Sequence, residues 1–534
     1  MTSQTDNKNK SLKQTKATDL ILQIVNQLAL EMHHGKQPKH SVNLDTMLDR
    51  DLQLDSLSRV ELLQRIERKF QVRLPEKLLA MAETPGDLLQ GVMNAPDISP
   101  GIQDIAKISE IETAQSEAIE TRPDHAQTLI EVLQWHLKKH PQRPHIYLYG
   151  DEDVPLVISY ADLFEGAQKI AAGLQDYGVE SGQTVAIMLP TGEDYLFTYF
   201  AILLVGAIPV PIYPPTRPSQ LEEHLRRHAK ILNNADSVLL ITIKEAKIPG
   251  QLLKAQVSNL RHVLIVNELR EQKNQYVPIP VQGKDIAFLQ YTSGSTGTPK
   301  GVVLTHYNLL ANIRAMGQVV QASSNDVFVS WLPLYHDMGL IGAWLGSLYY
   351  ASPLVLMSPL TFLTHPSRWF WAIHKHKGTL SAAPNFAYEF CLSKIKDEDI
   401  KELDLSSWRM AFNGAEPVNP KTLRDFANRF KHYGFHPEAL SAVYGLAESA
   451  VGLAFPPPGR GALIDCVQRD ALQLSGIAQA EAHSEESKND SCLEFAACGQ
   501  PLPGYQIRIV DQAGRELPER REGRLQFQGP SATS

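Results

Sequence analysis

The sequence is poor in cysteine and has no large excess of either charge. It contains four cysteines among 534 residues, and its net charge is −8 with acidic and basic residues interspersed. The cysteines (Cys391, Cys466, Cys492 and Cys498) show neither the spacing of metal ligands nor a disulfide framework, which predicts a protein of the reducing cytoplasm. Without a basic excess, the composition does not indicate a nucleic-acid partner.

The sequence also lacks a clear membrane segment. Residues 1–16 are polar and lysine-rich, without the apolar core of a signal peptide. One uncharged apolar run, Tyr195–Tyr213, is nearly long enough to cross a bilayer, but Gly206, Pro209 and Pro211 interrupt it. We therefore predict a helix over residues 195–206 followed by a buried strand, and no transmembrane span.

Length and periodicity predict an α/β protein with more than one folding unit. A chain of 534 residues is too long for one ordinary domain. Strand-like runs at Thr184–Leu189, Val238–Thr242 and His262–Val266 alternate with helical patterns. This alternation is typical of largely parallel sheets covered by helices.

A hydroxyl- and glycine-rich loop closed by a lysine lies in the middle of the chain. Residues 291–301 read Tyr-Thr-Ser-Gly-Ser-Thr-Gly-Thr-Pro-Lys-Gly, between the strand-like runs Ile286–Leu289 and Val302–Leu304. Glycines let the backbone approach an anion, and backbone N–H groups, hydroxyls and Lys300 can bind phosphate oxygens. The spacing is not that of a Walker A loop, which is followed by a helix. The alternative is a flexible surface turn.

This loop resembles the phosphate-binding signature of the acyl-adenylate-forming superfamily, and later segments match the same family in order. The resemblance implies binding of ATP and Mg²⁺, with Glu448 as the metal ligand. His336, in Tyr335-His336-Asp337, falls at the mouth of the family's acyl pocket. The implied catalytic residues are Lys300, Thr292, His336 and Glu448. The implied nucleotide-binding residues are Thr292, Ser293, Gly294, Ser295, Thr296, Gly297, Lys300, Asn413, Gly414, Ala415, Glu416, Tyr444 and Gly445.

The N-terminal region has helical periodicity over residues 18–33 and again from Ser56 to Phe70. Its Asp55-Ser56-Leu57 segment resembles the attachment site of acyl carrier proteins, which implies a 4′-phosphopantetheine arm on Ser56. A helix N-terminus favours the phosphodiester that attaches such an arm. The alternative is an unmodified helical docking module. The fold class expected is thus an α/β adenylate-forming domain preceded by an all-α four-helix carrier bundle.

The expected organisation has four parts. These are a disordered N-terminus at residues 1–17, a carrier domain at 18–93, a proline-containing linker at 94–125 and the adenylating domain at 126–534. The chain ends just after Glu522-Gly523-Arg524, which matches the start of a late family segment. The resemblance therefore implies that the family's small C-terminal domain follows Ser534 in a longer protein.

About 50 residues separate Glu448 from Cys498, and 478–491 is acidic, small and polar. Fatty acyl-AMP ligases are the branch known for an insertion here, and His365–Trp369 and Ala383–Tyr388 also resemble that branch. The alternative is a tolerated loop insertion without bearing on the acceptor.

The function we expect is activation of a fatty acid to acyl-AMP, with transfer to the phosphopantetheine thiol of an acyl carrier protein in cis or in trans. A phosphopantetheinyl transferase would modify Ser56. One alternative is a long-chain acyl-CoA synthetase that uses free CoA, and the other is a non-catalytic nucleotide- or lipid-binding scaffold with a docking bundle. His224 and His228, and His374 and His376, lack the partners of a zinc site, and we expect His224 and His228 on a solvated helix.

Overall fold

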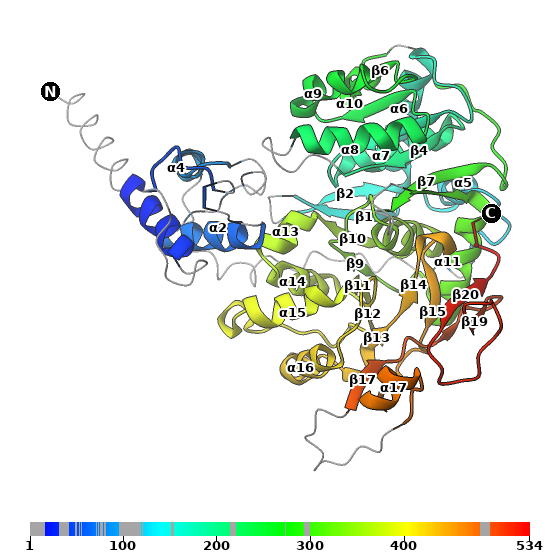
Figure 1. The fold of residues 1–534 in the computed structure, drawn as a ribbon. Helices are drawn as coiled ribbons and strands as arrows, with labels where there is room; N and C mark the ends of the chain where they lie inside the picture. Colours follow the sequence, from blue (N-terminus) through cyan, green and yellow to red (C-terminus); the bar gives the residue numbers. More distant parts are fainter. Residues whose placement is uncertain are drawn as a thin grey trace.

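The structure is a computed structural model. It describes residues 17–30, 42–48, 51–52, 54, 56–70, 72, 74, 78, 82–95, 119, 121–150, 154–213, 221–272, 274–292, 300–480 and 492–533. The large body formed by the residues from 121 onwards contains two parallel sheets covered by helices, and the helical N-terminal module lies at one side of it (Figure 1).

The smaller parallel sheet has the strand order β4-β3-β5-β6. Its strands are β3 (Thr184–Met188), β4 (Ile208–Pro211), β5 (Leu239–Thr242) and β6 (His262–Ile265). Helix α7 (Glu193–Leu204) connects β3 to β4, and all of its residues from Tyr195 onwards are buried. The prediction of a helix followed by a buried strand is confirmed. Helix α7 ends at Leu204, Gly206 follows with φ of 68°, and Pro209 and Pro211 lie within β4. Within the described residues, no helix is long and apolar enough to cross a membrane.

The larger sheet has seven strands in the order β13-β12-β11-β9-β10-β1-β2. Only the pair β1–β2 is antiparallel. The strands are β1 (Pro144–Tyr149), β2 (Leu156–Ser159), β9 (Phe328–Ser330), β10 (Leu354–Met357), β11 (Leu380–Ala383), β12 (Met410–Asn413) and β13 (Leu440–Ala442). In a parallel sheet the strand C-termini share one edge, where α/β proteins bind ligands.

Helices cover both sheets, which confirms the predicted α/β class. The α-helices of the body not yet named are α5 (Leu129–Lys139), α6 (Tyr160–Asp176), α8 (Leu221–Asn234), α9 (Lys244–Lys254), α10 (Val266–Arg270), α11 (His306–Val320), α12 (Gly346–Tyr350), α13 (Pro359–Thr364), α14 (Ser367–His376), α15 (Asn385–Lys394), α16 (Pro420–Phe430) and α17 (Arg469–Ser475). A π-helix, η3 (Met338–Leu345), precedes α12. The described part of the body also contains the 3₁₀ helices η4 (Asp397–Ile400), η5 (Lys431–Tyr433), η6 (Pro437–Ala439) and η7 (Ala447–Ser449).

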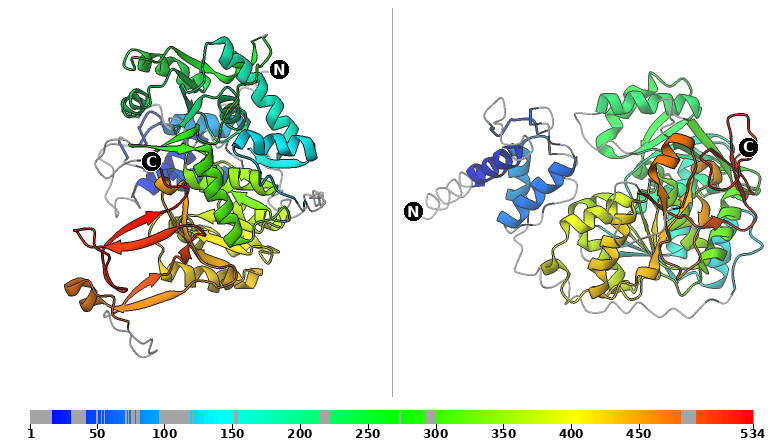
Figure 2. Two further views of the ribbon diagram at one scale, coloured as in Figure 1. Left: turned by 90° about the vertical axis from the view of Figure 1, so that its right-hand side faces the viewer. Right: turned by 60° about the horizontal axis from the view of Figure 1, so that its bottom comes forward.

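Antiparallel pieces complete the body. The hairpin β7 (Ile286–Thr292) and β8 (Lys300–Thr305) flanks the predicted phosphate loop. The others are β14 (Tyr444–Gly445), β15 (Gly452–Phe455), β16 (Ile464–Gln468), β17 (Cys492–Ala496), β18 (Gln500–Pro501), β19 (Gln506–Val510) and β20 (Arg524–Gln528). In the left view of Figure 2, the strands coloured orange to red stand out from one side of the body.

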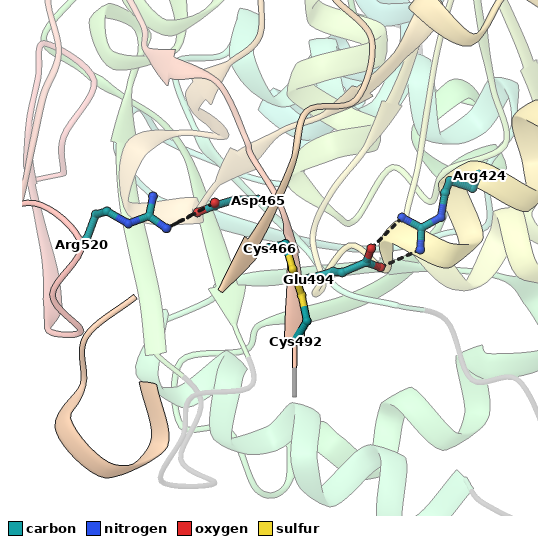
Figure 3. The surroundings of a disulfide bond; sticks show 6 residues. All are labelled: Arg424, Asp465, Cys466, Cys492, Glu494 and Arg520. Carbon is teal, nitrogen blue, oxygen red and sulfur yellow. Dashed lines mark hydrogen bonds and ion pairs between the residues drawn. A yellow bond between two sulfur atoms is a disulfide. The ribbon is translucent and has the colours of Figure 1, made fainter. Parts of the chain in front are cut away.

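A disulfide joins Cys466 of β16 to Cys492 of β17, so the prediction of no disulfide is wrong for this pair (Figure 3). The two cysteines lie on one face of the antiparallel ladder, two positions apart in register, with Cα atoms 6.0 Å apart. Their 26-residue separation hides this pairing in the sequence. Beside the disulfide, Arg424 binds both carboxylate oxygens of Glu494, at 3.1 and 2.6 Å.

The described part of the N-terminal module is helical, as predicted. Residues 17–30 form one helix, followed by α2 (Ser56–Phe70) and α4 (Pro85–Asn94). Thr84 caps α4, since its hydroxyl accepts from Asp87 N–H while the Asp87 carboxylate accepts from Thr84 N–H. Helix α2 lies against α13 of the body, where Glu67 Oε2 is 3.1 Å from His365 Nε2 (Figure 1).

Two histidines that we expected on a solvated helix are buried. His224 is 9% exposed and His228 is 0% exposed, and both rings contact Tyr213. The basic residues around them in the sequence suggested a solvated helix face, but the tertiary structure places β4 and its Tyr213 extension against that helix. Burial lowers the pKa of His224 to about 3 and that of His228 to about 4, so both are neutral. In the part of the chain that the structure describes, no group of three or more His, Cys, Asp or Glu is placed so that it could hold a metal ion.

Candidate active site

The two ends of the β7–β8 hairpin carry the first pair of candidate residues. Thr292 ends β7 and Lys300 begins β8, and the two face each other in the antiparallel register. Both line the same cavity. The residues between them that we predicted to bind phosphate (Ser293, Gly294, Ser295, Thr296 and Gly297) lie outside the described residues. The hairpin therefore fixes the lysine and one hydroxyl at the base of that loop.

His336 lies at the start of η3, after the C-terminal end of β9. Its Nδ1 is 2.7 Å from Oδ1 of Asp337, and the Asp337 side chain also accepts from the N–H of Met338 at the helix start. The hydrogen bond to Asp337 raises the pKa of His336 above its ordinary value. A half-exposed imidazole that stays protonated to higher pH supplies positive charge at the cavity wall.

The segment from Asn413 to Glu416 follows β12 at the same edge of the large sheet. Ala415, with φ of 68°, lines the cavity. Asn413 is fully buried and donates from Nδ2 to Asn385 Oδ1 at 3.2 Å. Gly414 leaves no room for a side chain, because a Cβ there would lie 2.9 Å from the Val443 carbonyl oxygen. Glu416 turns to the start of α15, where Oε1 accepts from Phe386 N–H at 2.6 Å.

Tyr444, Gly445 and Glu448 lie on the connection from β13 to β15, and all three line the cavity. The Tyr444 side chain is 40% exposed, so its ring is open to a stacking partner. A Cβ on Gly445 would lie 1.7 Å from the carbonyl oxygen of Val451, so only glycine fits there. Among the described residues, Glu448 forms no ion pair, which leaves its carboxylate available to a cation.

A buried polar network behind this connection was missed by the sequence analysis. Asn312 of α11 accepts from Gly452 N–H at 2.9 Å and donates to the Gly452 carbonyl oxygen at 2.8 Å. It also donates to the Ser531 hydroxyl at 3.2 Å, and Ser531 in turn donates to the carbonyl of Ser449 at 2.9 Å. The N–H of Thr533 donates to the Glu448 carbonyl at 2.8 Å. The sequence signal that could have revealed this network is Asn312 itself, a polar residue at a position where the helical pattern of α11 expects an apolar one.

The cavity has a volume of about 510 Å³ and two chemically different ends. At the C-terminal edge of the large sheet it is lined by Thr292, Lys300, His336, Asp337, Tyr444 and Glu448. It reaches the opposite edge at Phe328, which begins β9, and Leu380, which begins β11. The lining between α11 and η3 is mainly apolar, with Ile313, Met316, Val320 and Met338. The shape suits a ligand with a charged head and an alkyl tail.

The donor set at the polar end fits a magnesium ion that is shared with phosphate. Glu448 and Thr292 supply a carboxylate and a hydroxyl oxygen, which are hard ligands of the kind Mg²⁺ prefers. The described residues offer no complete protein cage, and Mg²⁺ usually binds through one or two carboxylates, substrate phosphates and water. When bound there, such an ion would neutralise phosphate charge.

Comparison with known proteins agrees with this geometry. A family model described as AMP-binding enzyme matches residues 133–534, and one described as phosphopantetheine attachment site matches residues 23–92. The chain belongs to the AMP-binding enzyme family. The domain boundaries proposed above at residues 17, 93 and 125 remain predictions.

Within the AMP-binding enzymes, several relatives are described as ligases of fatty acids. The medium-chain-fatty-acid–[acyl-carrier-protein] ligase JamA of Moorena producens is 32% identical, over 72% of this chain and 65% of its own length. TtuA of Teredinibacter turnerae, described in the same words, is 31% identical over 73% of this chain and 65% of its own length. The chain thus spans about 65% of the length of these relatives.

Solved structures of fatty acyl-adenylate ligases also resemble this chain. A structure from a study of fatty acyl-adenylate ligases of E. coli and L. pneumophila superimposes with a TM-score of 0.72 at 30% identity, covering 77% of this chain and 73% of that one. The L. pneumophila fatty acyl-adenylate ligase in complex with acyl adenylate and pyrophosphate gives 0.69 at 30% identity, covering 77% and 70%. The predicted resemblance of this AMP-binding enzyme to the fatty acyl-AMP ligases is confirmed.

Ser56, the candidate attachment residue, is the first residue of α2 and lies within the segment that matches the phosphopantetheine attachment family. Its neighbour Asp55 lies outside the described residues. A position in the first turn of a 15-residue helix places the serine where the helix N-terminus favours a phosphate group. The contact between Glu67 and His365 lies at the other end of α2, about 16 Å along the helix axis at 1.5 Å per residue.

Proposed function

We propose that this protein activates a fatty acid with ATP and passes the acyl group to a phosphopantetheine thiol on an acyl carrier domain. The observation that carries the proposal is the single cavity that joins Thr292, Lys300, His336 and Glu448 to an apolar interior. A fatty acid placed in it would have its carboxylate among cations and its chain among Ile313, Met316 and other apolar side chains.

In the first step, a carboxylate oxygen of the fatty acid attacks the α-phosphorus of ATP and pyrophosphate leaves. Lys300 and the hydrogen-bond donors around it would offset the repulsion between the two anions and stabilise the charge that develops. His336, whose pKa is raised by the hydrogen bond to Asp337, would in its protonated form attract the carboxylate to the cavity mouth. Tyr444 would stack on the adenine, and Glu448 would hold Mg²⁺ beside the phosphates.

In the second step, a thiolate attacks the acyl carbonyl carbon and AMP leaves. A phosphopantetheinyl transferase would first attach the arm to Ser56. Support for a carrier acceptor comes from the matching N-terminal segment and from the relatives described as acyl-carrier-protein ligases. The contact of α2 with α13 places the module beside the body, which makes transfer within one chain feasible.

The test is mass spectrometry of the full-length protein after treatment with a phosphopantetheinyl transferase, ATP, Mg²⁺ and a fatty acid, with a parallel reaction that contains free CoA. We expect acyl-AMP, followed by an acyl group on Ser56 and little acyl-CoA. Acyl-CoA without protein loading would refute the carrier as acceptor and support an acyl-CoA synthetase.

Two lysine variants test the role of Lys300 in the first step. Lys300→Ala should lower the rate of acyl-AMP formation by about 100- to 1,000-fold, the effect of losing one donor that stabilises transition-state charge. Lys284→Ala, an exposed lysine just before β7, is the matched control and should leave the rate unchanged. Equal rates in the two variants would refute the role of Lys300, and absence of acyl-AMP with the wild-type protein would support the non-catalytic scaffold instead.

We also propose the cytoplasm as the compartment. The cytosol keeps thiols reduced, so in the cell the Cys466–Cys492 disulfide would form only on oxidation, and alkylation at the moment of lysis should label both cysteines. Protection of both thiols would place the protein in an oxidising compartment instead.

A further inference from the structure

An aromatic ring, that of Tyr350, closes the apolar part of the cavity toward the protein surface. Tyr350, the last residue of α12, lines the cavity and is 6% exposed. Its hydroxyl donates to the Arg314 carbonyl oxygen at 3.3 Å. A Cβ on Gly317 would lie 2.1 Å from Cζ of Tyr350, so the ring packs directly against the backbone of α11. The absence of a side chain at Gly317 is what lets the ring take this place.

A second hollow of about 500 Å³ lies on the other side of the same ring. It shares Gly317, Ala322 and Tyr350 with the cavity, so these three residues form the wall between the two spaces. The rest of its lining is polar and consists of Arg122, Asp124, Arg314, Gln318, Gln321 and Tyr349. The wall therefore separates an apolar interior from a polar surface.

The polar groups behind the wall form a connected set. Arg314 Nε donates to the Tyr349 hydroxyl at 2.9 Å, and that hydroxyl donates to Asp124 Oδ1 at 3.0 Å. The guanidinium of Arg122 lies over the Tyr350 ring, 5.8 Å from its centroid. The ring thus has a cationic group on its outer side and the acyl cavity on its inner side.

Small residues line other parts of the cavity wall. A Cβ on Gly342 of η3 would meet no atom within 4 Å, and one on Gly346 would meet only the Ile341 carbonyl oxygen at 3.5 Å. Ala382 of β11 adds another small lining residue. The walls along η3 and β11 therefore leave space, whereas the Tyr350 ring fills the wall toward the polar hollow.

We propose that Tyr350 is the specificity-determining residue for acyl chain length. It is a partition that stops the chain before the polar hollow lined by Arg122 and Arg314. This inference rests on the proposed function and deepens it. A terminal methyl group meets an apolar ring at the partition, whereas a terminal carboxylate would lose its water there, and burial of a charge costs far more than burial of a methyl group. The protein should therefore select chains of limited length with an apolar end.

The test compares variants of the full-length protein in a competition among saturated fatty acids of increasing length, with acyl-AMP products quantified by mass spectrometry. Tyr350→Ala should open the wall, so that chains just beyond the wild-type limit gain about tenfold or more in kcat/KM, since one methylene in an apolar pocket changes this ratio about 10- to 200-fold. Tyr350→Trp should shift the profile to shorter chains. Tyr350→Phe keeps the ring and should reproduce the wild-type profile.

Dicarboxylic fatty acids probe the polar hollow. Wild-type protein should discriminate against a chain with a second, terminal carboxylate, and Tyr350→Ala should accept it better because the new opening leads to Arg122 and solvent. Short-chain activity is the internal control for folding of each variant. If Tyr350→Ala is inactive on every chain, the partition is tested by whether Tyr350→Trp shifts the length profile to shorter chains.

Three results have distinct meanings. Wild-type length profiles in both Tyr350→Ala and Tyr350→Trp, with short-chain activity retained, would overturn the partition and leave the proposed function intact. A gain for longer chains in Tyr350→Phe would show that the hydroxyl bond to Arg314 sets the limit, which would also overturn it. No acyl-AMP from any chain in the wild-type protein would refute the proposed function itself.

Discussion

Replacement of Asn312 tests whether the buried network behind the β13–β15 connection supports the active site. The side chain is 0% exposed and makes two hydrogen bonds to the Gly452 peptide group, at 2.9 and 2.8 Å. In Asn312→Ala, the Gly452 N–H loses its acceptor in a dry environment, which costs about 1–3 kcal/mol. The void left by the shorter side chain and the lost bond to Ser531 add about 1 kcal/mol. We expect the free energy of unfolding to fall by about 3 kcal/mol.

The same change should reduce catalysis, because Asn312 and Ser531 fix the segment that carries Glu448. A displacement of about 1 Å in a catalytic group can cost about 100-fold in rate. The assays are urea unfolding followed by circular dichroism, and the acyl-AMP formation rate at a temperature where the variant stays folded. Gln318→Ala, at an exposed position of the same helix, should change stability by less than about 0.5 kcal/mol. Equal stability losses in the two variants, or an unchanged rate in Asn312→Ala, would refute the reasoning.

Three further predictions concern acid sensitivity, the histidine at the cavity mouth and the disulfide. Burial lowers the pKa of His136 to about 2, so the folded protein holds this ring neutral while the unfolded chain protonates it below pH 6.5. The free energy of unfolding should therefore fall by about 2 kcal/mol between pH 6.5 and pH 5. His136→Phe should show a flatter dependence of the unfolding free energy on pH. Because Asp337 raises the pKa of His336, Asp337→Asn should move the alkaline rise in KM for the fatty acid to lower pH, and an unmoved profile would contradict this role. Reduction of the Cys466–Cys492 disulfide, which spans 26 residues, should lower the free energy of unfolding by about 3 kcal/mol. The Cys466→Ser variant is the control, because adding a reductant to it should not lower its stability.

Local sequence patterns were enough to predict the elements around the site. Gly206 takes φ of 68° just after α7, and the prolines at 209 and 211 cannot continue a helix, so the change from α7 to β4 follows from local sequence. Alternation of apolar strands and amphipathic helices predicted parallel sheets. The hairpin that presents Thr292 and Lys300 was predicted in the same way, because both of its strands are short apolar runs beside glycine-rich residues.

Long-range pairings were not predictable in this way. The basic residues near His224 and His228 indicated a solvated helix, but packing of Tyr213 against that helix buries both rings. The pairing of Cys466 with Cys492 depends on which strands become neighbours, and no local pattern specifies that. The role of Asn312 depends on Gly452 and Ser531, which are 140 and 219 residues away in the chain.

The sequence by itself determined which residue types are available for the chemistry of this AMP-binding enzyme. Residue types such as the lysine of the glycine-rich loop or the serine at a helix start have their properties wherever the chain places them. The tertiary structure alone decided the shape of the cavity, since the ring of Tyr350 closes it only because α12 packs against Gly317 of α11. Side-chain chemistry is local, whereas the volume between side chains is set by contacts between segments far apart in the chain.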